Sequence, residues 1–140
     1  MGKTDDPMRI DLSWSGDLRF EARADRVTLP LDGDSENGFS PMKTLLASLC
    51  ACMGIDVVMI LQKMRADLKS LNVSVTGVRN DSLPKYFRKI NLEFDIVGAI
   101  PKDRIERAIQ LSFDKYCSVF HTLRKDIVIG YDVTLSIEKE

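Results

Sequence analysis

The sequence predicts an α+β fold in which a layer of helices covers antiparallel strands. Two observations lead to this prediction. Segments with alternating apolar and polar residues follow one another in pairs joined by short turns, instead of alternating one by one with helices. In addition, the apolar segment 41–64 is long enough to form a helix of roughly 36 Å. The chain has 140 residues, so we expect residues 1–140 to form a single domain.

Three short strands are expected before the long helix. From Met8 to Trp14 every second residue is apolar, a pattern that is typical of a half-buried strand. The turn residues at 15–17 indicate that the next segment returns as the second strand of a hairpin. The expected strands are 8–14, 18–24 and 26–31, and the composition of 32–38 predicts a loop.

The central helix is expected to begin at Pro41. The hydroxyl of Ser40 can cap free N–H groups, and the fixed φ of Pro41 suits the first helical turn. The middle of the segment is apolar on every side, which predicts a helix that is buried all round. Few other residues are available to bury it, so we infer that a second subunit covers part of it. A membrane span is disfavoured, because Asp56 would lie in hydrocarbon at a cost of roughly 2.5–3.5 kcal/mol.

Two strands, two helices and a last strand are expected after the central helix. The alternating segments 71–80 and 86–97 predict an antiparallel hairpin. A second helix should begin at Pro101, where an apolar stripe with helical spacing follows, and the pattern restarts near Cys117. This restart predicts a bend and a short third helix through Lys125. The last expected strand is 127–137.

Composition narrows the class of protein. The net charge is −1 and there is no basic run. This disfavours nucleic-acid binding, because neutralising the phosphates of a nucleic acid requires clustered Lys and Arg. Residues 1–7 contain no apolar segment of the kind found in secretory signals. With three cysteines in such a chain, we expect a reducing cytoplasm and no disulfide scaffold. The motifs Cys-x-x-Cys, Gly-x-Gly-x-x-Gly, Gly-x-Ser-x-Gly and His-Glu-x-x-His are absent. Their absence disfavours a thioredoxin, a dinucleotide-binding protein, a hydrolase and a zinc protease, in that order.

The three cysteines are the first candidates for chemistry. Cys50 and Cys52 lie about 200° apart around a helix, so they face different ways and cannot form a disulfide within it. Cys117 is on another element, so Cys52 and Cys117 are the pair that could meet across a core. The alternative is that both are inert core thiols, because free cysteine is among the most buried residue types.

Two other residues lie one helical turn from these cysteines. Asp56 follows Cys52, and a neighbouring carboxylate opposes thiolate formation. We expect its partner to be a backbone N–H group or an arginine. His121 follows Cys117 on the same helical face, which leaves open a Cys–His dyad or ordinary surface packing. One Cys and one His make a poor zinc site, and we predict no metal and no organic cofactor.

The chain resembles the OsmC/Ohr family, which comprises osmotically inducible protein C and the organic hydroperoxide resistance proteins. The resemblance covers nearly the whole length and is carried by the segments Trp14–Phe20, Gly38–Val58, Pro84–Ile90 and Arg107–Val119. It is strongest to the small "predicted redox protein" branch. It implies an intertwined α+β homodimer, with antiparallel sheets around a long buried central helix and two active sites at the subunit interface. It also implies a cysteine-based peroxidase that acts in the stress response on organic hydroperoxides and is reduced by an external dithiol.

The resemblance also implies roles for individual residues. Cys52 would be the peroxidatic cysteine and Cys117 the resolving one. Arg19 matches the family arginine that holds the thiolate, with Arg26 as the alternative. The chain departs from the family at Lys43, where a Glu usually stands that orients the arginine and caps the helix.

Two interpretations of Lys43 stay open. In the first, its charge stabilises the Cys52 thiolate. In the second, it marks a member that kept the fold as a binding or structural dimer and lost peroxidase activity.

Overall fold

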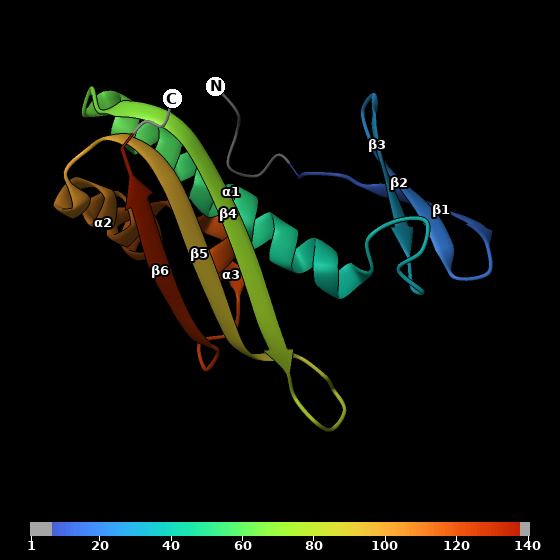
Figure 1. Ribbon diagram of the computed structural model, residues 1–140. Helices are drawn as coiled ribbons and strands as arrows, with labels where there is room; N and C mark the ends of the chain where they lie inside the picture. Colours follow the sequence, from blue (N-terminus) through green and yellow to red (C-terminus); the bar gives the residue numbers. More distant parts are fainter. Residues whose placement is uncertain (1–6, 138–140) are drawn as a thin grey trace. The chain divides into compact units, whose positions relative to one another are not determined.

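The computed structural model describes residues 7–137 and confirms the predicted α+β class. It contains two three-stranded sheets and one long helix, as Figure 1 shows. The chain separates into two compact units, Met1–Leu45 and Leu46–Glu140, which are described in turn. The prediction of a single domain over residues 1–140 stays a prediction. The expected lack of a secretory signal concerns residues 1–7, of which 1–6 lie outside the described residues.

The N-terminal unit is an antiparallel meander. Its strands are β1 (Asp11–Gly16), β2 (Arg19–Ala24) and β3 (Val27–Asp32), paired in that order. All three lie within a few residues of the predicted segments. The expectation that the first strand is half-buried is wrong: Trp14 is 68% exposed and Leu12 is 55% exposed. The reason is that β1 is the edge strand of a sheet with only three strands, so little of the unit is available to cover it.

The loop after β3 is held by a carboxylate. Asp32 is buried, and its side chain accepts hydrogen bonds from the backbone N–H groups of Asp34 at 2.9 Å and Asn37 at 3.0 Å. These two donors hold the pKa of Asp32 below its usual value. The backbone N–H of Asp32 donates to the carbonyl of Phe39, which closes the loop immediately before the central helix.

The central helix, α1 (Pro41–Lys63), begins where the sequence predicts. The Ser40 hydroxyl accepts a hydrogen bond from the backbone N–H of Lys43 at 3.3 Å, which is the expected N-terminal cap. Burial on every side is not observed within one chain. One stripe is buried, at four-residue spacing, and it consists of Leu49, Met53, Val57 and Leu61. Ala51, Ile55 and Met59 are exposed on another face of the helix.

α1 is also long and apolar enough to cross a membrane, judged by length and composition alone. Among residues 7–137 it is the single helix that meets these criteria. Core helices of soluble proteins meet them as well. Here the buried stripe packs within the protein, as expected for a core helix. The predicted absence of a membrane span stays a prediction.

The C-terminal unit is built on a second sheet. Its strands are β4 (Asp67–Arg79), β5 (Phe87–Ala99) and β6 (Val128–Ser136), in the order β4-β5-β6. β4 begins at Asp67, earlier than predicted, because its first residues pair with the end of β5 although their own pattern is irregular. β4 and β5 are antiparallel as predicted, whereas β6 runs parallel to β5. The parallel pair was not predicted, and it follows from the helical crossover between β5 and β6.

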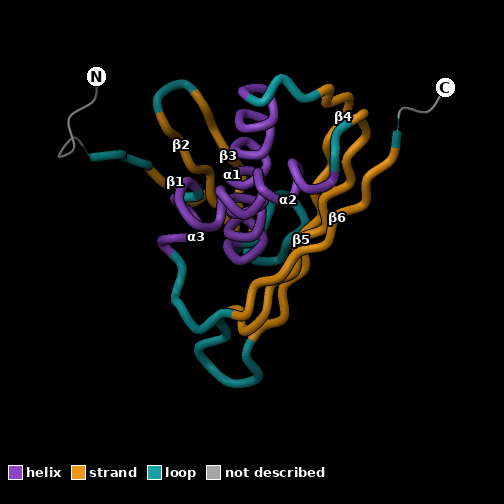
Figure 2. Tube along the Cα trace, turned by 90° about the vertical axis from the view of Figure 1, so that its left-hand side faces the viewer, coloured by secondary structure: helices purple, strands orange, loops and turns teal. Residues whose placement is uncertain are grey.

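The helices of this unit lie on one face of the sheet, as Figures 1 and 2 show. The sheet contributes the alternate side chains Ile90, Leu92, Phe94 and Ile96 of β5, all of them buried, as the alternating pattern predicts. α2 (Lys102–Leu111) adds Ile105, Ala108 and Ile109. A single turn of π-helix, η1 (Ser112–Tyr116), then leads into α3 (Ser118–Thr122), which is shorter than predicted.

Candidate functional site

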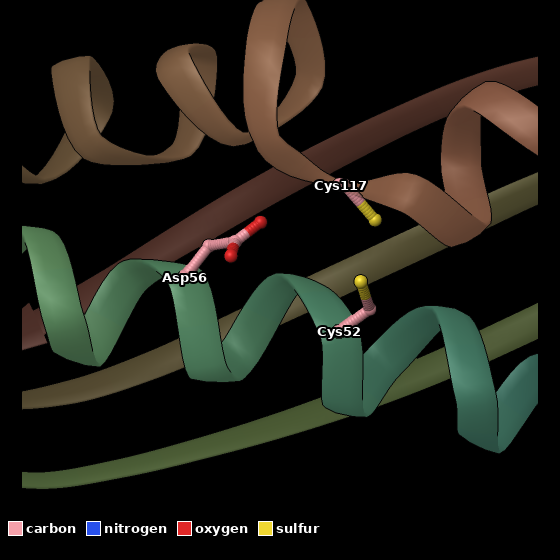
Figure 3. A group of neighbouring side chains, drawn as sticks. All are labelled: Cys52, Asp56 and Cys117. Carbon is pink, nitrogen blue, oxygen red and sulfur yellow. The ribbon is translucent and has the colours of Figure 1, made fainter. Parts of the chain in front are cut away.

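Two cysteines and one carboxylate from separate parts of the C-terminal unit meet beside α1. Cys52 and Asp56 lie one turn apart on α1, and Cys117 lies at the junction of η1 and α3. Figure 3 shows the two cysteine side chains pointing toward each other, with Asp56 beside them. Both sulfur atoms and a carboxylate oxygen of Asp56 lie within 4.8 Å of one another. The tertiary fold therefore brings together the cysteine pair and the carboxylate that the sequence singles out.

The orientation of α1 decides which of its cysteines takes part. The Cys50 thiol donates a hydrogen bond to the carbonyl oxygen of Val73 in β4, at 3.6 Å. Burial against the sheet raises the pKa of Cys50. Cys52 faces away from this strand and toward Cys117. This agrees with the prediction that the two neighbouring cysteines face different ways.

The π-helical turn sets the position of Cys117. The backbone N–H of Cys117 donates to the carbonyl of Ser112 at 2.8 Å, five residues earlier, which is the hydrogen bond of a π-helix. The backbone of Cys117 then becomes extended, and its sulfur accepts the N–H of Phe120 at 3.3 Å. The thiol thus caps the N-terminus of α3. π-Helical turns of this kind are frequent at functional sites.

Burial makes Cys117 a weakly acidic thiol. Its side chain is fully buried, and desolvation raises its pKa from 9.0 to about 12. The neighbouring Cys52 and the negative charge of Asp56 act in the same direction, whereas the N–H of Phe120 partly opposes them. Cys117 is therefore protonated at neutral pH. Cys52 is half-buried, so solutes have better access to it.

Asp56 has a different partner from the one predicted. Its Oδ2 accepts a hydrogen bond from the hydroxyl of Ser112 at 2.7 Å, rather than from a backbone N–H group or an arginine. Ser112 is fully buried, so its hydroxyl needs a partner inside the protein. Sequence reasoning did not single out Ser112. The available signal was a polar residue in the apolar stripe of the second helix.

The other predicted residues lie elsewhere in the chain. Arg19, Arg26 and Lys43 belong to the N-terminal unit, in β2, the β2–β3 turn and the first turn of α1. The Arg19 guanidinium lies 3.8 Å from the carboxylate of Asp17. The roles predicted for these three cations stay predictions. Nε2 of His121 lies 2.8 Å from the carbonyl oxygen of Phe113, which favours the packing alternative over a Cys–His dyad.

A cavity of about 300 Å³ adjoins the site. Asp56 lies in its wall and so borders both the cavity and the cysteine pair. The other lining residues are mainly apolar, with Lys63 as the one cation: Met59, Ile60, Lys63, Met64, Leu111 and Tyr116. A mainly apolar cavity of this size can hold the hydrocarbon part of a small organic molecule.

Cys52, Asp56 and Cys117 together offer a metal ion two sulfur ligands and one carboxylate ligand. A structural zinc site takes four protein ligands, and the group found among residues 7–137 supplies three. The set therefore does not fit a structural zinc site. The prediction that the protein uses no metal and no organic cofactor stays a prediction.

Three comparisons place the chain among known proteins. The family model "OsmC-like protein" matches residues 32–132. Protein YhfA of Escherichia coli (strain K12) is 38% identical over 127 residues, which cover 89% of this chain and 95% of YhfA. An OsmC-like protein from Mycoplasma pneumoniae has the same fold, with a TM-score of 0.83 and 24% identity over 95% of this chain and 99% of that one.

A more distant structure is that of the organic hydroperoxide resistance protein OsmC from Legionella pneumophila. It is similar in fold, with a TM-score of 0.63 and 15% identity over 98% of this chain and all of that one. The family model covers well over half of the chain, and the YhfA match extends nearly from end to end. The chain therefore belongs to the OsmC family.

Proposed function

We propose that this protein is a two-cysteine thiol peroxidase that reduces organic hydroperoxides. One observation carries the proposal: Cys52 and Cys117, on separate elements, point toward each other with their sulfur atoms within 4.8 Å. A small approach of the two side chains would allow a disulfide to form. In the OsmC/Ohr family that the sequence resembles, a cysteine pair at these positions implies peroxide reduction.

The proposed cycle has three steps. The Cys52 thiolate attacks the distal oxygen of the hydroperoxide; the O–O bond breaks, an alcohol leaves after taking up a proton, and Cys52 becomes a sulfenic acid. The Cys117 sulfur then attacks the Cys52 sulfur, which releases water and forms a disulfide. An external dithiol reduces this disulfide by thiol–disulfide exchange and is itself oxidised. The peroxide is thus reduced by two electrons that the dithiol supplies.

Burial supports the assignment of the two roles. The thiolate is the nucleophile in the first step, and the pKa of Cys117 is raised to about 12 because that thiol is desolvated. At neutral pH Cys117 therefore reacts poorly with a peroxide in solution. Cys52 is half-buried and better placed to meet a substrate. A cation near Cys52 would stabilise both its thiolate and the charge that develops as the O–O bond breaks; Arg19 is the proposed cation.

The cavity supports an apolar substrate. Its wall includes Met59, Ile60 and Leu111, and it adjoins Asp56 beside the cysteine pair. We propose that the hydrocarbon part of the hydroperoxide occupies this cavity while the peroxide group lies at Cys52.

The proposed assembly is a homodimer in the cytoplasm. Ile55 is 59% exposed and Met59 is 53% exposed on α1, although both are large and apolar. A second copy of the chain that covers this face would bury both side chains. The dimer is the assembly that the family resemblance implies.

Mass spectrometry after addition of a few equivalents of cumene hydroperoxide tests the proposal. The wild type should lose the mass of two hydrogen atoms and give a Cys52–Cys117 crosslinked peptide. In Cys117→Ser, a sulfenic acid should be trapped on Cys52, and Cys52→Ser should stay reduced. Cys50→Ser is the matched control, because Cys50 faces β4, and it should behave like the wild type.

The alternative is an OsmC-fold dimer that binds a ligand or a protein and has inert thiols. Two features favour it: the carboxylate of Asp56 lies beside both thiols, and Lys43 stands where the family resemblance implies a Glu. If the wild type stays reduced under conditions that oxidise an active relative, the peroxidase proposal is wrong and this alternative takes its place.

A further inference from the structure

We propose that Asp56 is the catalytic base and acid of the second step. Its carboxylate takes the proton from Cys117 and gives it to the leaving oxygen of the Cys52 sulfenic acid. Ser112 is the positioning residue that orients this carboxylate. The inference rests on the peroxidase cycle proposed above and extends it to two residues that otherwise have no role in the chemistry.

The need for a base follows from the burial of Cys117. This thiol is fully buried and carries its proton at neutral pH, whereas the nucleophile in disulfide formation is a thiolate. Ionisation into the surroundings of Cys117 is opposed by desolvation. A proton acceptor within reach of the sulfur removes this obstacle, because the proton then leaves as the S–S bond forms.

Asp56 is placed to be that acceptor. One of its carboxylate oxygens lies within 4.8 Å of both sulfur atoms, a distance that allows transfer directly after a small movement or through one water. The hydroxyl of Ser112 donates to Oδ2 at 2.7 Å, so the carboxylate is held while Oδ1 can take up a proton. The same Ser112 accepts the backbone N–H of Cys117 at 2.8 Å. Ser112 thus holds both the carboxylate of Asp56 and the backbone of Cys117, whose thiol Asp56 deprotonates.

The step balances without any further reactant. The carboxylate takes the proton of the Cys117 thiol as the Cys117 sulfur attacks the Cys52 sulfur. The S–O bond of the sulfenic acid breaks, and its oxygen leaves with the proton that Asp56 returns. The products are one water, the Cys52–Cys117 disulfide and an unchanged Asp56 carboxylate. The Cys117 sulfur supplies the electron pair of the new S–S bond and is oxidised, the Cys52 sulfur is reduced, and the pair of the broken S–O bond leaves with the oxygen.

The first step does not use Asp56 as a base. A carboxylate beside Cys52 repels the negative charge of the attacking sulfur and of the departing oxygen, so removing that charge should leave peroxide attack at least as fast as before. Asp56→Asn should therefore slow the second step without slowing the first. Damage to the fold would slow both.

Rapid-quench mass spectrometry with cumene hydroperoxide tests the proposal. Sulfenic acid is trapped with dimedone, and disulfide is counted in the peptide map. In Asp56→Asn we expect sulfenic acid to form at least as fast as in the wild type and disulfide to form about 100-fold more slowly, the usual contribution of one general acid–base group. Ser112→Ala should slow disulfide formation by a smaller factor. Asp95→Asn, an exposed carboxylate of β5, is the matched control and should leave both rates unchanged.

A second measurement does not depend on a variant that folds. In the wild type, disulfide formation should be slower in D₂O than in H₂O, because a proton moves in that step. Disulfide formation at the wild-type rate in Asp56→Asn, or no solvent isotope effect, would overturn the role of Asp56 while the peroxidase cycle stands. A wild type that forms neither sulfenic acid nor disulfide would instead overturn the cycle, and this role with it.

Discussion

The buried Cys117 thiol should make the stability of the protein depend on pH in the alkaline range. Its pKa rises from 9.0 to about 12, mainly because the side chain is desolvated. A thiol is neutral below its pKa, so burial favours the protonated form in the folded state. The stabilisation is fully present below pH 9 and is lost as the pH rises from 9 toward 12.

The size of the effect follows from linkage. Each pKa unit corresponds to about 1.4 kcal/mol, and at pH 10.5 the unfolded thiol is almost fully ionised while the folded one is not. The free energy of unfolding should therefore fall by about 2 kcal/mol between pH 8 and pH 10.5 on account of Cys117 alone.

The assay is urea unfolding at several pH values, on the reduced wild type and on Cys117→Ala. Other groups ionise in this range, but those away from Cys117 contribute equally to both proteins, so the difference between the two reports on Cys117 and its immediate neighbours. Wild type should be the more stable protein at pH 8, and its advantage should shrink steadily above pH 9. A difference that is constant to within 0.5 kcal/mol up to pH 10.5 would refute the reasoning that this thiol is buried in its neutral form.

Three further outcomes are expected. Lys43→Glu should raise the free energy of unfolding by about 0.5–1 kcal/mol in thermal unfolding. A Glu would complete a capping box with Ser40, and its negative charge would interact favourably with the positive end of the helix dipole. An unchanged unfolding midpoint would argue against this cap. Phe94→Ala should cost about 3–5 kcal/mol in urea unfolding because the ring is buried in the core, whereas the exposed neighbour Glu93→Ala should cost less than about 0.5 kcal/mol. Ile55→Lys should shift the protein toward the monomer in sedimentation velocity if α1 carries the dimer interface, and an unchanged sedimentation coefficient would place that interface elsewhere.

Most secondary structure is predictable because its causes are local. The alternation in β5 selects the buried face of that strand before any contact is known, and the structure buries Ile90, Leu92, Phe94 and Ile96 as expected. The start of α1 is equally local, since it depends on the hydroxyl of Ser40 and the ring of Pro41. The order of strands and helices follows from such signals alone.

The features that the sequence did not predict depend on contacts between distant segments. β4 begins at Asp67 because the end of β5 offers it hydrogen-bond partners. β6 is parallel to β5 because the helices between them return the chain to the end of the sheet at which β5 begins. Burial on α1 is restricted to one stripe because the rest of this chain covers only part of the helix surface.

The candidate site likewise has a part that the sequence predicts and a part that depends on contacts between distant segments. The sequence by itself determined which residues are candidates for chemistry: Cys52 and Asp56 share a helical face because they are one turn apart, and Cys50 turns away. Only the tertiary structure decided that Cys117 meets them and that Ser112, rather than an arginine, holds Asp56. Helical periodicity fixes angles within one element, whereas the approach of α1 to the π-helical turn depends on how both pack on the sheet.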